Sequence, residues 1–393
     1  MRRTEFDTLV SAMLESQPGV SDLLFCVRKP FQVESFGVLK TVDMHHPDIR
    51  QLTPWQIEQI ALVIMGDERR LMRDLIALGS CDCAYSLNDQ NRFRVNIFRQ
   101  RGNFAIVMRK LQSEIPTMEG LFLAPVFHEI AREKTGLVLV TGATGSGKTT
   151  TLAAVLNEIN EQMDVHIITL EDPIEYVHPH KRSTFNQREL GTDFDTYPNG
   201  LRAALRQAPK VILVGEMRDR QTVEIAMTAA ETGHLVLSTI HTIDAGQSIN
   251  RILGMFEQGE EEQVRQRLGE TLRYIVSQRL VPKIGGGRQL IMEIMGSNLR
   301  TRESIMLGEV EGRTFNEIIE ASETFGWMTF ERSIANAFEA DLITEEVAES
   351  FSTRKGKMSR LLDMIKKRRG EQDHASGMRL DKPQPTPQSF SKR

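Results

Sequence analysis

One glycine-rich stretch near the middle of the chain has the residue types and the spacing that bind phosphate. Residues 142–149 have the pattern G-x-x-x-x-G-K-T; they follow the apolar run 137–140 and precede residues 150–159, whose apolar positions have helical spacing. Glycines in a loop between strand and helix let backbone N–H groups and the positive end of the helix dipole face a phosphate. The stretch therefore predicts a nucleotide-binding site.

Two side chains of this stretch would act on the nucleotide directly. Lys148 would neutralise charge on the β- and γ-phosphates, and the Thr149 hydroxyl would ligate Mg²⁺. ATP and Mg²⁺ are therefore the predicted cofactors. The other predicted nucleotide-binding residues lie on the loop and the first turn of the helix: Gly142, Thr144, Gly145, Ser146, Gly147 and Thr150.

Acidic and histidine side chains accompany the three apolar runs that follow this loop. The polar segments are 171–175 (Glu-Asp-Pro-Ile-Glu), 215–219 (Gly-Glu-Met-Arg-Asp) and 238–242 (Ser-Thr-Ile-His-Thr), with 232–234 (Thr-Gly-His) just before the last run. The C-terminal ends of parallel strands share one edge of a sheet, where ligands bind. We therefore expect the three polar segments at the strand ends, 171–175, 215–219 and 238–242, to converge on the Mg-nucleotide.

ATP hydrolysis needs a held metal ion, a water aligned with the γ-phosphate and cations for the developing charge. The apolar residues before Glu216 form a Walker B pattern, so Glu216 is expected to hold Mg²⁺ together with Thr149. Glu175 is the preferred general base for the water. Asp172 and Glu216 stay open as alternatives for that role.

The composition excludes several classes of protein. With 393 residues, 40% hydrophobic and 26% charged, the chain has the composition of a soluble protein of two or three domains. A net charge of −4 argues against a basic nucleic-acid-binding face, and no apolar run is long enough for a transmembrane helix. The N-terminus lacks the apolar core of a signal peptide. The cysteines, Cys26, Cys81 and Cys83, are expected to be reduced thiols of a cytoplasmic protein.

The elements expected around these motifs form an α/β protein with a separate N-terminal domain. In that domain we expect strands at 23–27 and 31–42 and helices at 57–64 and 71–78. Residues 92–98 and 104–111 are expected to form an antiparallel hairpin. Beyond a helix at 125–134, strands and helices alternate as a parallel sheet requires. Residues 261–277 are expected to be helical, 289–295 a strand, and the polar end of the chain disordered.

Four segments together resemble the type IV pilus retraction ATPases, the PilT/PilU branch of the secretion ATPases. Residues 141–149, 170–177, 211–219 and 232–242 are similar to that family's Walker A, Asp box, Walker B and His box, in that order. The resemblance spans about residues 20–350. It implies a PAS-like N-terminal domain (1–115) and a RecA-like P-loop ATPase domain (123–300). The residues themselves predict a linker (116–122), a helical C-terminal subdomain (301–370) and a disordered tail (371–393).

The resemblance also implies a hexameric ATPase motor that drives pilus retraction, pilin disassembly and twitching motility. It implies a homohexamer with ATP between neighbours, peripheral association with the cytoplasmic face of the inner membrane, and no nucleic-acid partner. An inner-membrane platform protein and a paralogous retraction ATPase are the other implied partners. The family's phosphate-contacting arginines correspond to Arg94 and Arg109, its γ-phosphate-sensing or ring-contact histidines to His234 and His241, and its catalytic glutamate to Glu175.

The sequence departs from this family's pattern at several places. Residues 21–24 are Ser-Asp-Leu-Leu where Ser-Asp-Leu-His is expected, and the Ala-Ile-Arg-Asn-Leu segment is absent after Met295. Residues 326–331 resemble the PilU members more closely. An accessory or structural subunit of a partner ring is therefore one alternative. A pilus or secretion assembly ATPase is disfavoured because no tetracysteine module is present, and a nucleic-acid translocase because the chain lacks a basic, aromatic-rich stripe.

Overall fold

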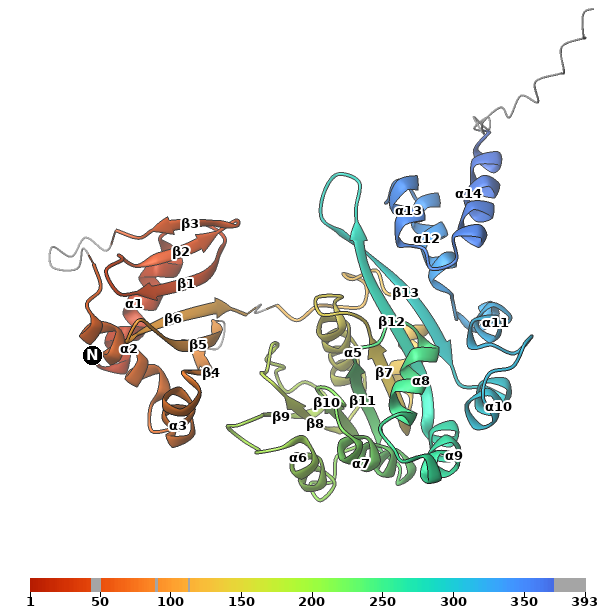
Figure 1. Ribbon diagram of the computed structural model, residues 1–393, viewed down its shortest axis with the longest axis horizontal. Helices are drawn as coiled ribbons and strands as arrows, with labels where there is room; N and C mark the ends of the chain where they lie inside the picture. The colour runs from red at the N-terminus through yellow and green to blue at the C-terminus, as the bar shows by residue number, and fades with distance from the viewer. Residues whose placement is uncertain (44–50, 89–90, 112–113, 371–393) are drawn as a thin grey trace, which may run out of the picture. The chain divides into compact units, whose positions relative to one another are not determined.

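The computed structural model describes residues 1–43, 51–88, 91–111 and 114–370 (Figure 1). The chain forms two compact units: Met1–Leu280 with Met292–Thr329, and Val281–Ile291 with the residues from Phe330 onward. The tail expected to be disordered, 371–393, lies outside the described residues. The domain boundaries predicted from the sequence stay a prediction, although the structure assigns residues 301–329 to the first unit.

The N-terminal part of the first unit contains a six-stranded sheet with the order β3-β2-β1-β6-β5-β4. All of its neighbouring strands are antiparallel. The alternation of apolar and polar residues fixes which side is buried: Phe93, Val95 and Ile97 are buried whereas Arg94 is exposed. The strands are β1 (Val20–Cys26), β2 (Gln32–Ser35), β3 (Val38–Thr41), β4 (Ser80–Ser86), β5 (Arg92–Gln100) and β6 (Asn103–Lys110).

Three helices accompany this sheet: α1 (Arg3–Glu15), α2 (Pro54–Met65) and α3 (Arg69–Leu78). Helix α2 begins after an N-cap, because the Thr53 hydroxyl accepts a hydrogen bond from the Gln56 N–H at 3.3 Å. The single strand expected over 31–42 is wrong. Phe36 and Gly37 both have positive φ angles and form a turn between β2 and β3.

A seven-stranded sheet with the order β13-β12-β7-β11-β10-β8-β9 forms the second part of the first unit. Strands β7, β10 and β11 are buried at every position, which is why their sequences are almost continuously apolar. The pairs β12–β7, β7–β11, β11–β10, β10–β8 and β8–β9 are all parallel. The strands are β7 (Gly136–Thr141), β8 (His166–Glu171), β9 (Thr184–Glu189), β10 (Val211–Val214), β11 (Leu235–Ile240), β12 (Leu272–Pro282) and β13 (Arg288–Gly296).

The helices of this part follow the strands along the chain (Figure 1). Two of them begin at aspartates that act as N-caps: Asp219 accepts from Thr222 N at 2.9 Å, and Asp244 from Gln247 N at 2.7 Å. They are α4 (Val126–Arg132), α5 (Lys148–Gln162), α6 (Tyr197–Ala204), α7 (Arg220–Glu231), α8 (Ala245–Leu253), α9 (Glu261–Thr271), α10 (Leu299–Leu307) and α11 (Phe315–Glu320), with short 3₁₀ turns at Gln258–Glu260 and Glu323–Phe325.

The helix expected over 261–277 ends earlier than predicted. Helix α9 stops at Thr271, and the chain continues as strand β12 from Leu272. Leu272, Ile275 and Val276 are fully buried and lie beside β7, so pairing with this buried strand overrides the helical spacing of these residues.

The second unit is helical and is built on α12 (Phe330–Glu339), α13 (Glu345–Phe351) and α14 (Lys355–Arg369). Its core contains Val281 and Ile291 together with apolar residues of the helices. The side chain of Glu331 is buried there and accepts hydrogen bonds from Thr353 N at 3.2 Å and Arg354 N at 2.8 Å. Across the described part of the chain, no helix is both long enough and apolar enough to cross a bilayer.

Candidate functional site

The glycine-rich loop joins β7 to α5, as the sequence predicted. Gly142, Gly145 and Gly147 have φ angles of 145°, 77° and 92°, which side-chain-bearing residues rarely adopt. A Cβ on Gly142 would lie 2.4 Å from Ser146 Oγ and 2.6 Å from the Gln278 carbonyl oxygen. The Ser146 side chain and the backbone of β12 therefore approach the loop closely at its first glycine.

Gly142→Ala is expected to weaken ATP binding at least tenfold and to destabilise the fold by about 1–3 kcal/mol, because it combines a strained φ with a steric clash. Gly145→Ala is the matched control: its φ is also positive, but no atom lies within 4 Å of the added Cβ. Calorimetric binding and thermal unfolding would measure both effects. Equal losses in the two variants would contradict the importance of the close approach at Gly142.

Lys148 lies at the first position of α5 with its side chain buried. Its Nζ donates hydrogen bonds to the carbonyl oxygens of Gly142 at 2.9 Å and Ala143 at 3.0 Å. Burial lowers the pKa of Lys148, and the negative charges of Glu216 and Glu175 oppose that shift. The charges of both glutamates thus act on Lys148, whose direct partners among the described residues are the two loop carbonyl oxygens.

The remaining loop side chains fit a bound triphosphate. The Ser146 hydroxyl is buried and has no hydrogen-bond partner in the structure, so it is free to bond a phosphate oxygen. Thr144 and Thr149 are exposed, whereas Thr150 Oγ1 lies 3.3 Å from Tyr176 Oη. The loop helix is thereby linked to the segment that carries Glu175.

Glu216 follows β10 and connects two strand ends. One carboxylate oxygen lies 3.3 Å from Nε2 of His241, which follows β11, and the other pairs with Arg218. Within the described residues no group of three or more His, Cys, Asp or Glu side chains could hold a metal ion. Mg²⁺ commonly uses one or two protein ligands and completes its shell with phosphate oxygens and water. Thr149 and Glu216 fit that donor set, and their metal role stays a prediction.

Glu175 lies between β8 and β9, half-buried, and Asp172 in the same segment is exposed. The first residue of this segment, Glu171, was not singled out from the sequence. Its side chain is buried and accepts hydrogen bonds from Thr169 Oγ1 at 2.6 Å and Gln187 Nε2 at 3.0 Å. Burial raises the pKa of Glu171 to about 7, against the lowering effect of these two donors.

Glu171→Gln is expected to change how stability depends on pH. The folded chain holds this proton up to about pH 7, whereas the unfolded chain releases it near pH 4.5, so the folded state binds more protons between those values. The contribution of Glu171 to the free energy of unfolding therefore falls as the pH rises through that window. The melting temperature of the variant relative to wild type should rise between pH 5 and pH 8. Parallel pH profiles for the two proteins would contradict this, and Asp172→Asn, at an exposed position, is the control.

His234 lies just before its strand, as the sequence indicates. It precedes β11, and its carbonyl oxygen accepts from Gly136 N at the start of β7, so it lies at the edge opposite the phosphate loop. Its Nδ1 is 3.0 Å from the Ala229 carbonyl oxygen. His241 follows its strand and lies at the edge of the phosphate loop, whereas the role of His234 as a phosphate sensor or ring contact stays a prediction.

Arg94 and Arg109 lie opposite each other in the register of β5 and β6, and both are exposed. Arg109 Nε donates to Asp22 Oδ1 at 2.8 Å, and Asp22 itself is buried. The two guanidinium groups thus lie on one face of the sheet. Their contact with phosphate stays a prediction.

A phosphate loop with acidic side chains at the neighbouring strand ends defines a P-loop nucleoside triphosphatase. Residues 84–288 match the family model described as "Type II/IV secretion system protein". The chain belongs to this family of ATPases and, within it, to the PilT/PilU group of type IV pilus ATPases.

Three relatives illustrate the match. The chain is 38% identical to the type IV pilus retraction ATPase PilT of Pseudomonas aeruginosa over 333 residues, covering 85% of this chain and 94% of the relative. It is 36% identical to PilU of the same organism over 345 residues, covering 88% and 87%. A crystal structure of the pilus retraction motor PilT with bound ADP superposes with a TM-score of 0.80 at 39% identity, covering 90% of this chain and 98% of that one.

Proposed function

We propose that this ATPase is a motor that couples ATP hydrolysis to type IV pilus retraction. The observation that carries the proposal is the phosphate loop between β7 and α5, with positive φ at its glycines, a buried Lys148 at the start of α5 and a buried Ser146 hydroxyl without a partner. The likeness to PilT and PilU extends over most of each chain and so supports the same kind of machine. The strand order β12-β7-β11-β10-β8 supports a RecA-like ATPase domain, and the antiparallel N-terminal sheet supports a PAS-like domain.

The hydrolytic step follows from the placement of the side chains. The loop N–H groups, Lys148 and the Ser146 hydroxyl would hold the phosphates of ATP. When bound, Mg²⁺ would neutralise charge on the β- and γ-phosphates, with Thr149 and Glu216 as its protein ligands. Glu175 would orient a water and accept its proton as the water oxygen bonds to the γ-phosphorus. The bond from that phosphorus to the bridging oxygen then breaks, which leaves ADP and phosphate.

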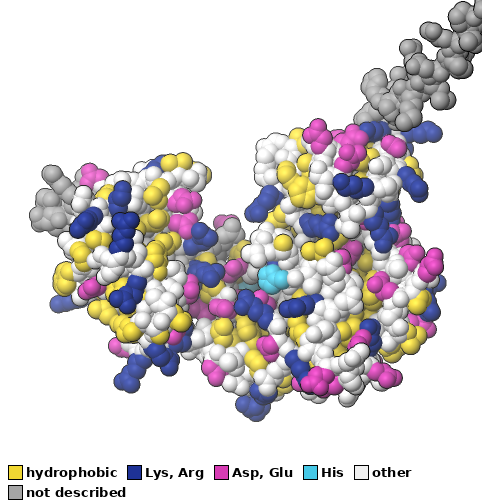
Figure 2. Space-filling view, viewed as in Figure 1, with side chains coloured by type: hydrophobic (Ala, Val, Ile, Leu, Met, Phe, Trp, Pro, Cys, Tyr) yellow, Lys and Arg dark blue, Asp and Glu magenta, His cyan; other side chains and the backbone are white. Residues whose placement is uncertain are grey.

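Further features of the proposal concern the assembly. In a homohexamer with ATP between neighbours, Arg94 and Arg109 of one subunit would reach the phosphates bound by the next. The motor would act at the cytoplasmic face of the inner membrane, on a platform protein and beside a paralogous retraction ATPase. No nucleic-acid partner is proposed. On the visible face of the molecule, basic and acidic side chains are interspersed (Figure 2), which supports that exclusion.

An accessory motor is the second candidate function, because the Ala-Ile-Arg-Asn-Leu segment is absent after Met295 and the likeness to PilU covers 88% of this chain. Pilus retraction in cells whose only retraction ATPase is this protein would decide between the two. Retraction that is lost in Glu175→Gln would support the autonomous motor. Retraction that appears only when a second retraction ATPase is restored would support the accessory role. Purified protein that hydrolyses no ATP would overturn both.

A further inference from the structure

The segment that carries Glu175 forms neither helix nor strand. It leaves β8 after Glu171 and enters the parallel strand β9 at Thr184. Its backbone groups therefore have no regular ladder of hydrogen bonds to fix them. A general base must nevertheless be held at a defined distance from its water, so other groups have to fix this segment.

One side chain of β9, Gln187, supplies hydrogen bonds on the C-terminal side of Glu175. Its Oε1 accepts from His178 N at 2.8 Å, and its Nε2 donates to the Tyr176 carbonyl oxygen at 2.8 Å. The same Nε2 donates to Glu171 Oε1 at 3.0 Å. The side-chain amide of Gln187 therefore links Glu171, the last residue of β8, to Tyr176 and His178, which follow Glu175.

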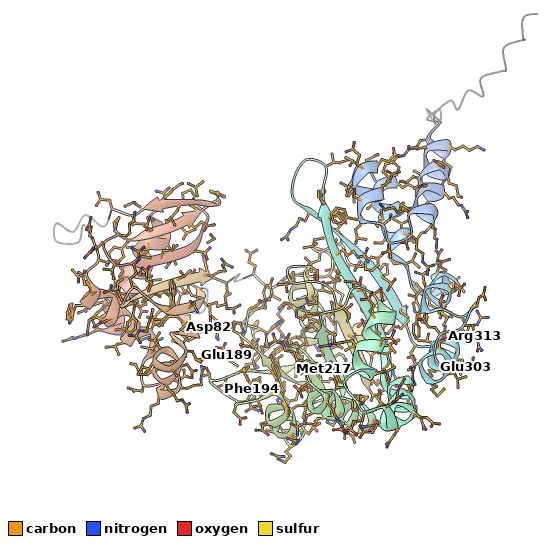
Figure 3. The ribbon with its side chains drawn as sticks, viewed as in Figure 1. Asp82, Glu189, Phe194, Met217, Glu303 and Arg313 are labelled. Atoms are coloured by element: carbon orange, nitrogen blue, oxygen red, sulfur yellow. The ribbon has the colours of Figure 1, made fainter. Side chains whose placement is uncertain are left out.

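A second side chain of β9, Glu189, supplies the hydrogen bond on the other side. Its Oε2 accepts from Ile174 N at 3.2 Å. Residues two apart on a strand face the same side, so Gln187 and Glu189 approach the segment together. Figure 3 labels Glu189 at the end of β9. Glu189 also forms an ion pair with Arg92, whereas Gln187 is uncharged, which makes Gln187 the better residue to test.

The end of the segment is fixed by packing as well. The ring of His178 stacks on Phe185 of β9, with ring centroids 4.4 Å apart and an interplanar angle of 8°. Backbone or side-chain contacts thus hold residues 174, 176 and 178 to β9, and Glu175 lies among them. Because Gln187 bonds the immediate neighbour of Glu175, movement of this amide would be passed to the Glu175 backbone.

We propose that Gln187 is a positioning residue for ATP hydrolysis, which holds the Glu175 carboxylate in place through Tyr176 and His178. The inference rests on the proposed role of Glu175 as general base. The competing explanation is that Gln187 only joins β8 to β9. That structural role would change stability and nucleotide affinity, whereas positioning acts on the hydrolytic step alone and needs Glu175 to be present.

The test compares two substitutions in the full-length protein with a control on the same strand. Gln187→Met keeps the approximate volume and removes all three hydrogen bonds. Gln187→Asn keeps the amide but shortens its reach, so it serves if the methionine variant fails to fold. Asn186→Ala is the control, since Asn186 is exposed, points to the opposite face and contacts His166 Nε2 at 2.9 Å.

Single-turnover hydrolysis of ATP and the dissociation constant of a fluorescent ATP analogue are the two readouts. Loss of positioning by about 1 Å lowers rates by up to about a hundredfold. We expect both Gln187 variants to hydrolyse on the order of tenfold to a hundredfold more slowly, with an unchanged dissociation constant. Asn186→Ala should match wild type. Wild-type hydrolysis rates in both Gln187 variants, or a proportional loss of nucleotide affinity, would overturn the proposal.

A double-mutant comparison separates this proposal from the proposed function. In a Glu175→Gln background, Gln187→Met should slow hydrolysis no further, because it acts through a base that is already absent. Additive losses would show that Gln187 acts by another route and would overturn the positioning role while leaving Glu175 as the base. Wild-type hydrolysis in Glu175→Gln alone would overturn the assignment of the base, and the positioning role with it.

Discussion

Replacing Glu175 with glutamine is expected to slow ATP hydrolysis by about 10²–10⁴-fold, the range typical of a general base, while ATP still binds. Glutamine keeps the shape of the side chain but cannot accept a proton from the attacking water. Phosphate release measured at saturating ATP, together with nucleotide affinity, would check the prediction. Asp172→Asn is the matched control, and a greater loss in that variant would transfer the role of base to Asp172.

The structure favours Glu175 over Glu216 for this role because the two carboxylates have different surroundings. Glu216 is paired with Arg218 and lies 3.3 Å from His241 Nε2, which suits a group that holds charge in place. No ion pair among the described residues involves the Glu175 carboxylate, and its segment is held to β9 through neighbouring residues. A titration with Mg²⁺ separates the roles: Glu216→Gln should raise the Mg²⁺ concentration for half-maximal activity, whereas Glu175→Gln should not.

The phosphate loop was predictable from sequence because its chemistry tolerates few residue types. Gly142 needs a positive φ and has no room for a Cβ, and Lys148 must begin the helix that follows. The strands that position the loop could also be predicted, since burial on both faces makes the sequences of β7, β10 and β11 almost continuously apolar. The α/β class and the order of the main elements followed from these two constraints.

The parts that could not be predicted depend on long-range pairing. Strand β9 is largely polar, with exposed Thr184 and Asn186 alternating with Phe185 and the half-buried Gln187, so its role beside β8 is set by the sheet rather than by its own hydrophobicity. The hydrogen bonds of Gln187 to Tyr176 and His178 could not be predicted either, because they depend on the pairing of β9 with β8.

Lys148→Met is expected to weaken ATP binding by about 3 kcal/mol, roughly a hundredfold in Kd, because it removes the buried cation that faces the β- and γ-phosphates. Without nucleotide the melting temperature should be unchanged or higher. Burial lowers the pKa of Lys148 in the folded state, so at neutral pH, well below the unfolded value near 10.5, holding it charged opposes folding. Methionine removes that unfavourable charge and fills a similar volume.

Thermal unfolding with and without ATP and Mg²⁺ measures both halves of this prediction in one experiment. A ligand at a hundred times its Kd stabilises a protein by about 2.7 kcal/mol, so wild type should melt at a clearly higher temperature when nucleotide is added. The variant should lose that increase and keep its nucleotide-free stability. A variant that retains the full increase would show that the loop N–H groups and Ser146 bind the phosphates without help from the lysine. Glu175→Gln, which should retain the increase but hydrolyse slowly, is the control that separates binding from chemistry.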